Sequence, residues 1–221
     1  MTGHARVPVP AQTSVSTQVP APVPALALVP TKRLPASGNT ALASSAIVQA
    51  ALGIEFALAG LNKAADPNYL ANFSSFVRAN PGASSGPLSL VVQAVVLPNA
   101  DAFATLLKVT ELALGPILLI GALEIGRRRL SGRLGAAHGY EAGVAFVAAL
   151  AGLTAAGLAF SIFLLMGGVL PTVMPGRAFT TAIPVELLIV PLGLSVAWLE
   201  FGRFHVLRQP RPIRVIAAAD R

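Results

Sequence analysis

Residues 42–61 are an apolar stretch whose length constrains the fold of this chain more than any other feature. An α-helix of roughly 20 residues rises about 30 Å, which matches the hydrocarbon core of a bilayer. The stretch holds a single charge, Glu55, and Lys63 follows its end. Because a carboxylate that faces lipid is unfavourable, we expect Glu55 to point into a helix bundle or a wet cavity. It would act there as a functional group or as a structural hydrogen-bonding residue.

The same stretch has two distinct faces when its residues are placed at ~100° intervals around a helix. Ala59 and Asn62 share the face of Glu55, and Lys63 lies at the edge of that face. The opposite face carries small residues, so we expect the backbone of another helix to approach it closely. These small residues are Gly53, Ala57, Gly60 and Ala64.

Three further apolar stretches predict membrane helices, at residues 103–123, 143–170 and 182–200. The composition agrees, because 54% of the 221 residues are hydrophobic, only 11% are charged, and the mean hydropathy is +0.71. In soluble domains about a quarter of the residues are charged. With a first span at 42–63, the sequence predicts an all-α, polytopic four-helix membrane bundle over residues 42–203.

The segments outside the spans are rich in proline or in charge. Residues 1–41 carry seven prolines, which predicts a disordered or polyproline-like tail because proline interrupts helices and nothing here can bury a core. Residues 204–221 form a basic tail. The connection 64–101 is predicted to be mostly loop. Within it, residues 69–79 suit a short amphipathic helix on the membrane face, whereas residues 88–97 are too short to span and suit a re-entrant, interfacial or lid segment.

Positive charge is concentrated on one side of the predicted spans. Twelve Lys and Arg residues fall before the first span, in the 124–141 loop or in residues 203–221, and three, Lys63, Arg78 and Arg177, fall in loops on the other side. Cytoplasmic loops carry such an excess of basic residues. We therefore predict a multi-pass protein of a bacterial plasma membrane with both termini in the cytoplasm. The net charge of +7 follows from this topology and does not indicate a nucleic-acid partner.

Charged residues within the spans predict one polar pocket in the outer half of the membrane. Lys108 and Glu111 are i, i+3 neighbours in the second span, and Glu186 lies near the outer end of the fourth. At ~1.5 Å per residue their depths are similar to that of Glu55. We interpret Glu55 and Glu111 as the catalytic groups that handle protons. The pocket for a substrate or a quinone would be lined by Lys63, Lys108 and Glu186.

Several kinds of chemistry are excluded by what the sequence lacks. There is no cysteine, so this chain has no disulfide, iron–sulfur cluster or thiolate metal site. The histidines, His4, His138 and His205, lie outside the predicted spans, so bis-histidine haem ligation within the membrane is not available. No nucleotide-binding or hydrolase motif stands in a credible context. We predict no metal site, and redox chemistry must belong to a substrate, a cofactor or a partner.

Two segments resemble the DoxX/DoxD-like family of small four-helix membrane proteins. The first, GIEFALAGLNK over residues 53–63, is similar to that family's opening pattern of Gly, Phe, Gly and Lys. The second, VLPNADAF over residues 96–103, followed by the Glu111 to Gly115 spacing, is similar to the second span of DoxD-type members. Glu55 and the long Pro-rich tail depart from the pattern. The match covers residues 46–125, and the positions that carry over are Gly53, Phe56, Gly60, Lys63, Glu111 and Gly115.

The resemblance implies the membrane subunit of a quinone-linked oxidoreductase of the thiosulfate:quinone type. Its cofactor would be a quinone, and its partners would be the lipid bilayer and a soluble or membrane redox protein. Two other functions fit the residues. One is a non-catalytic membrane anchor or assembly factor for a soluble redox protein, and the other is a small proton-coupled transporter that uses the same carboxylates as a relay. Substrate-driven proton movement in vesicles would distinguish the transporter from the first two.

Overall fold

The structure is a computed structural model of the chain. It describes residues 36–131, 140–168, 170 and 183–209. The predicted disordered tail lies outside the described residues up to residue 35, and the predicted basic tail 204–221 does so from residue 210. Residues 204–208 of that predicted tail belong to the last helix, which ends at Arg208. The helix α1 begins at Ala36, so the last part of the predicted 1–41 tail belongs to a helix instead. Residue 35 is the last proline before the first span, and a helix can continue once prolines cease.

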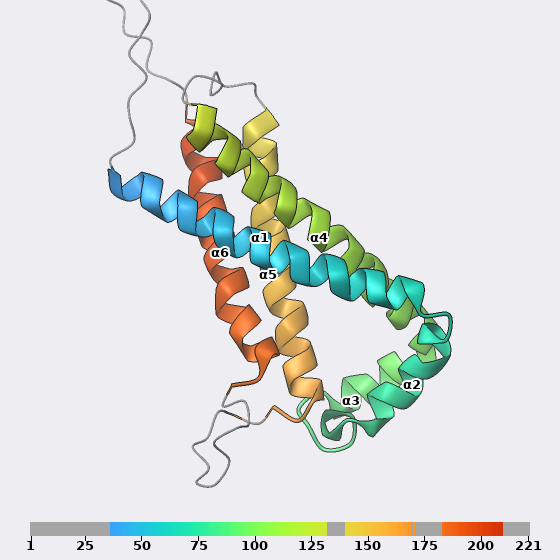
Figure 1. The fold of residues 1–221 in the computed structure, drawn as a ribbon. Coiled ribbons are helices and arrows are strands. Elements are labelled where there is room, and N and C mark those ends of the chain that lie inside the picture. Colours follow the sequence, from blue (N-terminus) through green and yellow to red (C-terminus); the bar gives the residue numbers. More distant parts are fainter. Residues whose placement is uncertain (1–35, 132–139, 169, 171–182, 210–221) are drawn as a thin grey trace, which may run out of the picture. The chain divides into compact units, whose positions relative to one another are not determined.

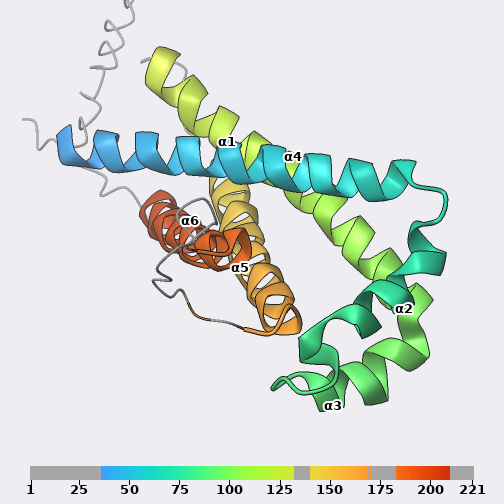
Figure 2. The ribbon, with the colours of Figure 1, turned by 60° about the horizontal axis from the view of Figure 1, so that its bottom comes forward.

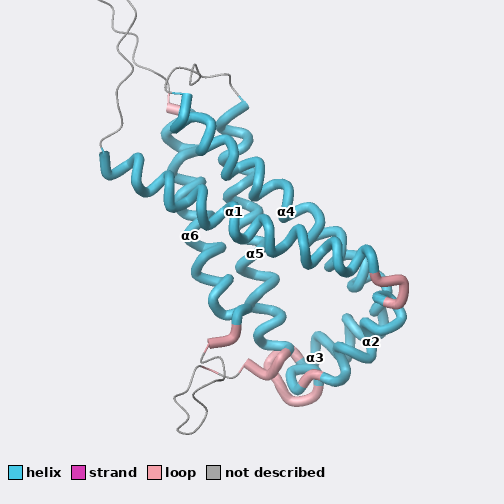
Figure 3. Tube along the Cα trace, in the orientation of Figure 1, coloured by secondary structure: helices cyan, strands magenta, loops and turns pink. Residues whose placement is uncertain are grey.

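The part of the chain that the structure describes is helical and contains no strand (Figure 1, Figure 3). Four helical segments are long and apolar enough to cross a membrane, which confirms the predicted all-α four-helix membrane fold. These candidate spans are Ala41–Ala65, Ser89–Arg127, Tyr140–Leu165 and Val185–Arg208. In chain order the elements are α1 (Ala36–Ala65), α2 (Tyr69–Ala79), η1 (Pro81–Ala83), α3 (Ser89–Val91), η2 (Val92–Val96), η3 (Leu97–Asn99), α4 (Ala100–Ser131), α5 (Tyr140–Leu165) and α6 (Val185–Arg208).

Two helix pairs build the bundle, because α1 packs along α4 and α5 packs along α6 (Figure 1, Figure 2). Small residues allow the backbones of each pair to approach closely. A Cβ placed on Gly115 would lie 2.8 Å from the Cα of Ala57, and one placed on Gly193 would lie 2.6 Å from the carbonyl oxygen of Gly152. The first contact confirms that the small-residue face of the first span receives another helix. Its residues that meet α4 are Gly53, Ala57 and Gly60.

An apolar core joins the two pairs in the middle of the bundle. Leu118 of α4 and Val196 of α6 are fully buried there. Within a bilayer such contacts act through close packing and dispersion rather than through exclusion of water. The buried members of this core are Leu52, Phe56, Leu114, Leu118, Ala151, Ala155 and Val196.

The elements α2 to η3 form a helical cap at one end of the bundle, with a small core of its own (Figure 1). Phe73 and Val77 of α2 pack there against Ala83, Val92 and the buried Ala104 of α4. The predicted amphipathic helix over residues 69–79 is present as α2. The cap therefore packs against the first turns of α4 and places α2 beside the end of α1.

The connection 64–101 is mostly helical, so the prediction that it is mostly loop is wrong. Residues 89–97 are helical and belong to the cap, as the predicted lid alternative would require, within a helical run of 39 residues over Ser89–Arg127. That length exceeds the roughly 20 residues needed to cross a bilayer. The π-helical turn Val92–Val96 and the 3-10 turn Leu97–Asn99 interrupt the run before α4, and α3 runs in a different direction from α4 (Figure 2). Pro98, which lacks a backbone N–H, is compatible with such an irregular turn.

The third span is shorter than predicted, because α5 ends at Leu165 rather than near residue 170. Gly167 and Gly168 follow with φ angles of +109° and +63°. Glycine adopts these angles without the steric cost of a Cβ, so the pair ends the helix.

Candidate functional site beside the Lys63–Glu111 ion pair

Lys63 near the end of α1 and Glu111 of α4 form an ion pair with an Nζ–Oε2 distance of 2.6 Å. Helix packing sets this pairing, because a Cβ placed on Gly60 would lie 2.8 Å from the backbone nitrogen of Leu112. Lys63 follows Gly60 by nearly one turn and therefore meets Glu111, the residue before Leu112. The side chain of Glu111 is 4% exposed and that of Lys63 is 25% exposed. A buried carboxylate is thus compensated by an ammonium group that remains accessible.

A first cavity of about 560 Å³ opens beside this ion pair on the polar face of α1. Its polar lining consists of carboxylates, an amide, an ammonium group and one phenol. We call it the polar cavity. Its lining residues are Glu55, Leu58, Ala59, Asn62, Lys63, Asp66 and Tyr69.

A second cavity of about 340 Å³ lies between α2 and α4. It shares Lys63, Asp66 and Tyr69 with the polar cavity, but most of the rest of its lining is aromatic or aliphatic. We call it the aromatic cavity. The residues that it does not share are Asn72, Phe73, Phe76 and Leu107. Both volumes fall within the roughly 300–1,000 Å³ that is common for small-molecule sites.

Tyr69 stands at the boundary of the two cavities, and its hydroxyl group is buried. This hydroxyl has no hydrogen-bond partner among the residues that the structure describes. Burial and the nearby negative charge of Glu111 raise the pKa of Tyr69 to about 12. The phenol therefore stays protonated at neutral pH, where it is available as a hydrogen-bond donor.

The structure brings together only some of the residues that the sequence predicted for the pocket. Glu55 is exposed on α1 and lines the polar cavity, close to Lys63. Lys108 is half-buried in α4 but lines neither cavity and forms no ion pair with a described residue. Glu111 pairs with Lys63 rather than with its i+3 neighbour. Glu186 lies in the first turn of α6 and also lines neither cavity.

The two cavities are lined by residues of α1, α2 and α4. The first two membrane helices, α1 and α4, take part as predicted, but α2 of the cap stands where the fourth membrane helix, α6, was predicted. The reason is the pairing of the helices, because the start of α6 lies beside the end of α5 (Figure 1). Sequence reasoning missed Tyr69, Phe73 and Phe76 as lining residues. Their spacing indicates a helix lying on the membrane, but aromatic residues three and four apart also form one face that can cover a site.

A second polar cluster lies at the other end of the bundle and joins α1 to α6. The Nε2 of Gln49 donates to Oγ of Ser45 at 2.9 Å and to Oε1 of Glu200 at 2.8 Å. Arg203 donates to the other oxygen of Glu200 at 3.0 Å. All four side chains are buried, and their hydrogen bonds compensate part of the loss of water. The Oε1 of Gln49 and one guanidinium nitrogen of Arg203 are buried without a hydrogen-bond partner among the described residues.

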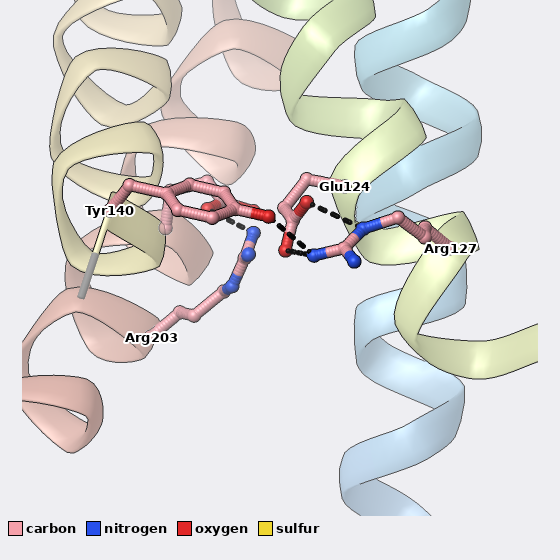
Figure 4. A network of polar contacts seen from close by, with 5 residues as sticks. Glu124, Arg127, Tyr140 and Arg203 are labelled. Atoms are coloured by element: carbon pink, nitrogen blue, oxygen red, sulfur yellow. Dashed lines mark hydrogen bonds and ion pairs between the residues drawn. The ribbon is translucent and has the colours of Figure 1, made fainter. Parts of the chain in front are cut away.

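The same end of the bundle holds a connection between α4 and α5. Arg127 donates two hydrogen bonds to the buried Glu124, at 3.0 and 3.1 Å, and one to the hydroxyl of Tyr140 at 2.7 Å. Figure 4 shows these three side chains and Arg203 directed toward one another from α4, α5 and α6. No pattern in the sequence assigned any of these residues to a buried network. We interpret this network, with Gln49 and Glu200, as a structural tie among the four membrane helices.

The fold defines the class of this chain, which is a multi-pass membrane protein, and a charged cavity lies at one end of its helix bundle. No group of three or more His, Asp or Glu residues that could hold a metal ion occurs in the described part of the chain. No protein-family model, no curated protein and no solved structure matches this chain.

Proposed function

We propose that this chain is the membrane subunit of a quinone-linked oxidoreductase, and that the quinone binds beside Lys63 and Glu111. The observation that carries the proposal is Lys63, which forms an ion pair with the buried Glu111 and lines both the polar and the aromatic cavity. A quinone has a planar ring and two oxygens that accept hydrogen bonds, so it needs both kinds of lining. The resemblance of residues 53–63 and 96–115 to DoxX/DoxD-like proteins supports the same function.

Reduction of a quinone to a quinol takes up two electrons and two protons. Lys63 can donate a hydrogen bond to a quinone oxygen, and Glu55 lines the polar cavity, where its carboxyl group can exchange protons with water. Glu111 is buried and lines neither cavity, so it acts on the site through its ion pair with Lys63. The chain has no cysteine and so supplies no thiol or iron–sulfur electron carrier. We propose that electrons come from a reduced sulfur substrate such as thiosulfate, directly or through a partner redox protein.

The middle of the bundle supports a binding site rather than a transport path. Phe56, Leu114 and Leu118 are buried in the apolar core, which separates the Lys63–Glu111 pair from the polar cluster around Glu200. A proton relay across the membrane would need polar groups or water along this segment. The proton-coupled transporter is therefore the weaker alternative.

The charge distribution supports a bacterial plasma membrane with both termini in the cytoplasm. In that orientation the cap, the polar cavity and the aromatic cavity lie on the outer side. A lipid-soluble quinone could reach them from the outer leaflet past Leu58 and Phe76, both of which are 54% exposed.

The test is an assay of thiosulfate-dependent quinone reduction in membranes from a deletion strain of the source organism. The strain is complemented with the wild type, with Lys63→Met or with Arg78→Met, which removes an exposed cation of α2. We expect no activity in the deletion, full activity with the wild type and Arg78→Met, and at least a tenfold loss with Lys63→Met. Equal rates in deletion and complemented membranes would reject the oxidoreductase. A full rescue by Lys63→Met would favour the membrane anchor, because the complex would then need the chain but not its site.

A further inference from the structure

We infer that the two cavities have different occupants: a quinone ring lies in the aromatic cavity, its oxygen bound by Tyr69 and Lys63, while the polar cavity holds water. This inference rests on the proposed function and deepens it. It assigns Tyr69 as a ligand-binding residue and α2 as the element that recognises the ring.

The lining of the aromatic cavity suits a planar ring. Phe73, Phe76 and Leu107 contribute aromatic and aliphatic surface to its lining, and aromatic rings gain from offset or edge contacts with one another. Phe76 is 54% exposed, so the cavity can be reached from outside the bundle. A ring placed here would cover apolar surface that the chain itself leaves open.

The polar cavity would accept a ring poorly. A ring in this cavity would cover the carboxylate of Glu55 and the amide of Asn62, neither of which lines the aromatic cavity. Burial of such groups without hydrogen bonds is unfavourable. Water can pair with all of them, and a cavity of about 560 Å³ has room for several molecules.

The unpartnered hydroxyl of Tyr69 marks where the ligand oxygen would lie. Buried polar groups nearly always have a hydrogen-bond partner, so an orphaned hydroxyl next to a cavity indicates a missing partner. Lys63 lines both cavities as well, so an ammonium group and a phenol, both hydrogen-bond donors, belong to the lining of the aromatic cavity. The raised pKa of Tyr69 keeps this donor protonated at neutral pH. A quinone oxygen, which only accepts hydrogen bonds, matches the pair.

Binding of a short-chain, water-soluble quinone to the purified full chain in detergent tests the inference, with isothermal titration calorimetry as the measurement. The chain has two tyrosines, Tyr69 and Tyr140, so Tyr140→Phe is a matched control at the other end of the bundle. We expect Tyr69→Phe to weaken binding by about three- to tenfold through the loss of one hydrogen bond. Tyr140→Phe should stay within about twofold of the wild type.

Two further variants test the choice of cavity. Phe76→Ala removes a ring of the aromatic cavity without opening a packed core, because Phe76 is exposed, and Phe160→Ala on α5 is its half-exposed control. We expect about a three- to tenfold loss for Phe76→Ala, and no loss for Phe160→Ala or for Asn62→Ala in the polar cavity. Binding that resists Tyr69→Phe and Phe76→Ala but is lost in Asn62→Ala would place the ring in the polar cavity and overturn the inference. Absence of any binding by the wild type would instead overturn the proposed function.

Discussion

Gln49 of α1 donates a 2.8 Å hydrogen bond to Glu200 of α6, 151 positions away in the sequence, and both side chains are fully buried. Glu200 also accepts a hydrogen bond from Arg203, whose side chain is 7% exposed. The carboxylate of Glu200 thus accepts hydrogen bonds from the amide of Gln49, in the α1–α4 pair, and from the guanidinium of Arg203, one turn further along α6. The amide and the guanidinium lose their water when the protein folds. Removal of Glu200 would therefore leave both of these buried donors without this acceptor and lower the stability of the folded state.

Glu200→Leu should destabilise the protein by about 3–5 kcal/mol, because it leaves Arg203 buried without its carboxylate. The double variant Glu200→Leu with Arg203→Met should recover much of this loss, since no charge is then left unpaired. Thermal unfolding of the detergent-purified variants measures both effects. Equal stability of the single and double variants would show that the pair is not coupled.

The Lys63–Glu111 pair gives a second prediction of the same kind. Lys63→Met leaves the buried carboxylate of Glu111 uncompensated and should lower the unfolding temperature clearly, whereas Lys63→Met with Glu111→Gln should be milder. Lys108→Met should have a small effect, because Lys108 forms no ion pair among the described residues. A larger loss for Lys108→Met than for Lys63→Met would contradict the pairing.

The close contact of α1 and α4 can be tested at one glycine. A Cβ on Gly115 would lie 2.8 Å from the backbone of Ala57, so Gly115→Ala should force the helices apart and cost about 1–3 kcal/mol. Gly126 is in the same helix, and a Cβ placed on it would have no described neighbour within 4 Å. Gly126→Ala should therefore be neutral or stabilising by up to ~1 kcal/mol through helix propensity. Thermal unfolding of both variants measures these effects. A Gly115→Ala protein as stable as the wild type would contradict the close contact between α1 and α4.

Tyrosine absorbance offers a prediction on protonation. Burial and Glu111 raise the pKa of Tyr69 to about 12, above the ordinary value of about 10. The folded state therefore holds this proton more tightly than the unfolded state, so the stabilisation is complete below pH 10 and is lost as the pH rises toward 12. A titration followed at the tyrosinate band in the Tyr140→Phe protein should show only about a tenth of Tyr69 ionised at pH 11 while the protein stays folded. Ionisation near pH 10 would show that the hydroxyl is not buried.

The spans, the small-residue face of the first span and the helix over residues 69–79 could all be predicted, because each depends on residues that are near one another in the sequence. The ion-pair partner of Glu111 could not be predicted from the sequence. Lys108 and Lys63 were both candidates, and Lys108 was nearer in the sequence. The choice depends on the register at which Gly60 meets Leu112, and that register is a property of two helices together. For the same reason the Gln49–Glu200 contact had no sequence signature.

The topology is the last prediction, and the cysteine-free sequence makes it directly testable. Single cysteines at Ser84, in the cap, and at Ser131, at the end of α4, place one thiol at each end of the second span. The excess of basic residues beside Ser131 predicts that this end faces the cytoplasm. An impermeant thiol reagent added to intact cells should label Ser84→Cys and spare Ser131→Cys, and both should react after the cells are opened. Labelling of Ser131→Cys alone in intact cells would invert the orientation and move both cavities to the cytoplasmic side.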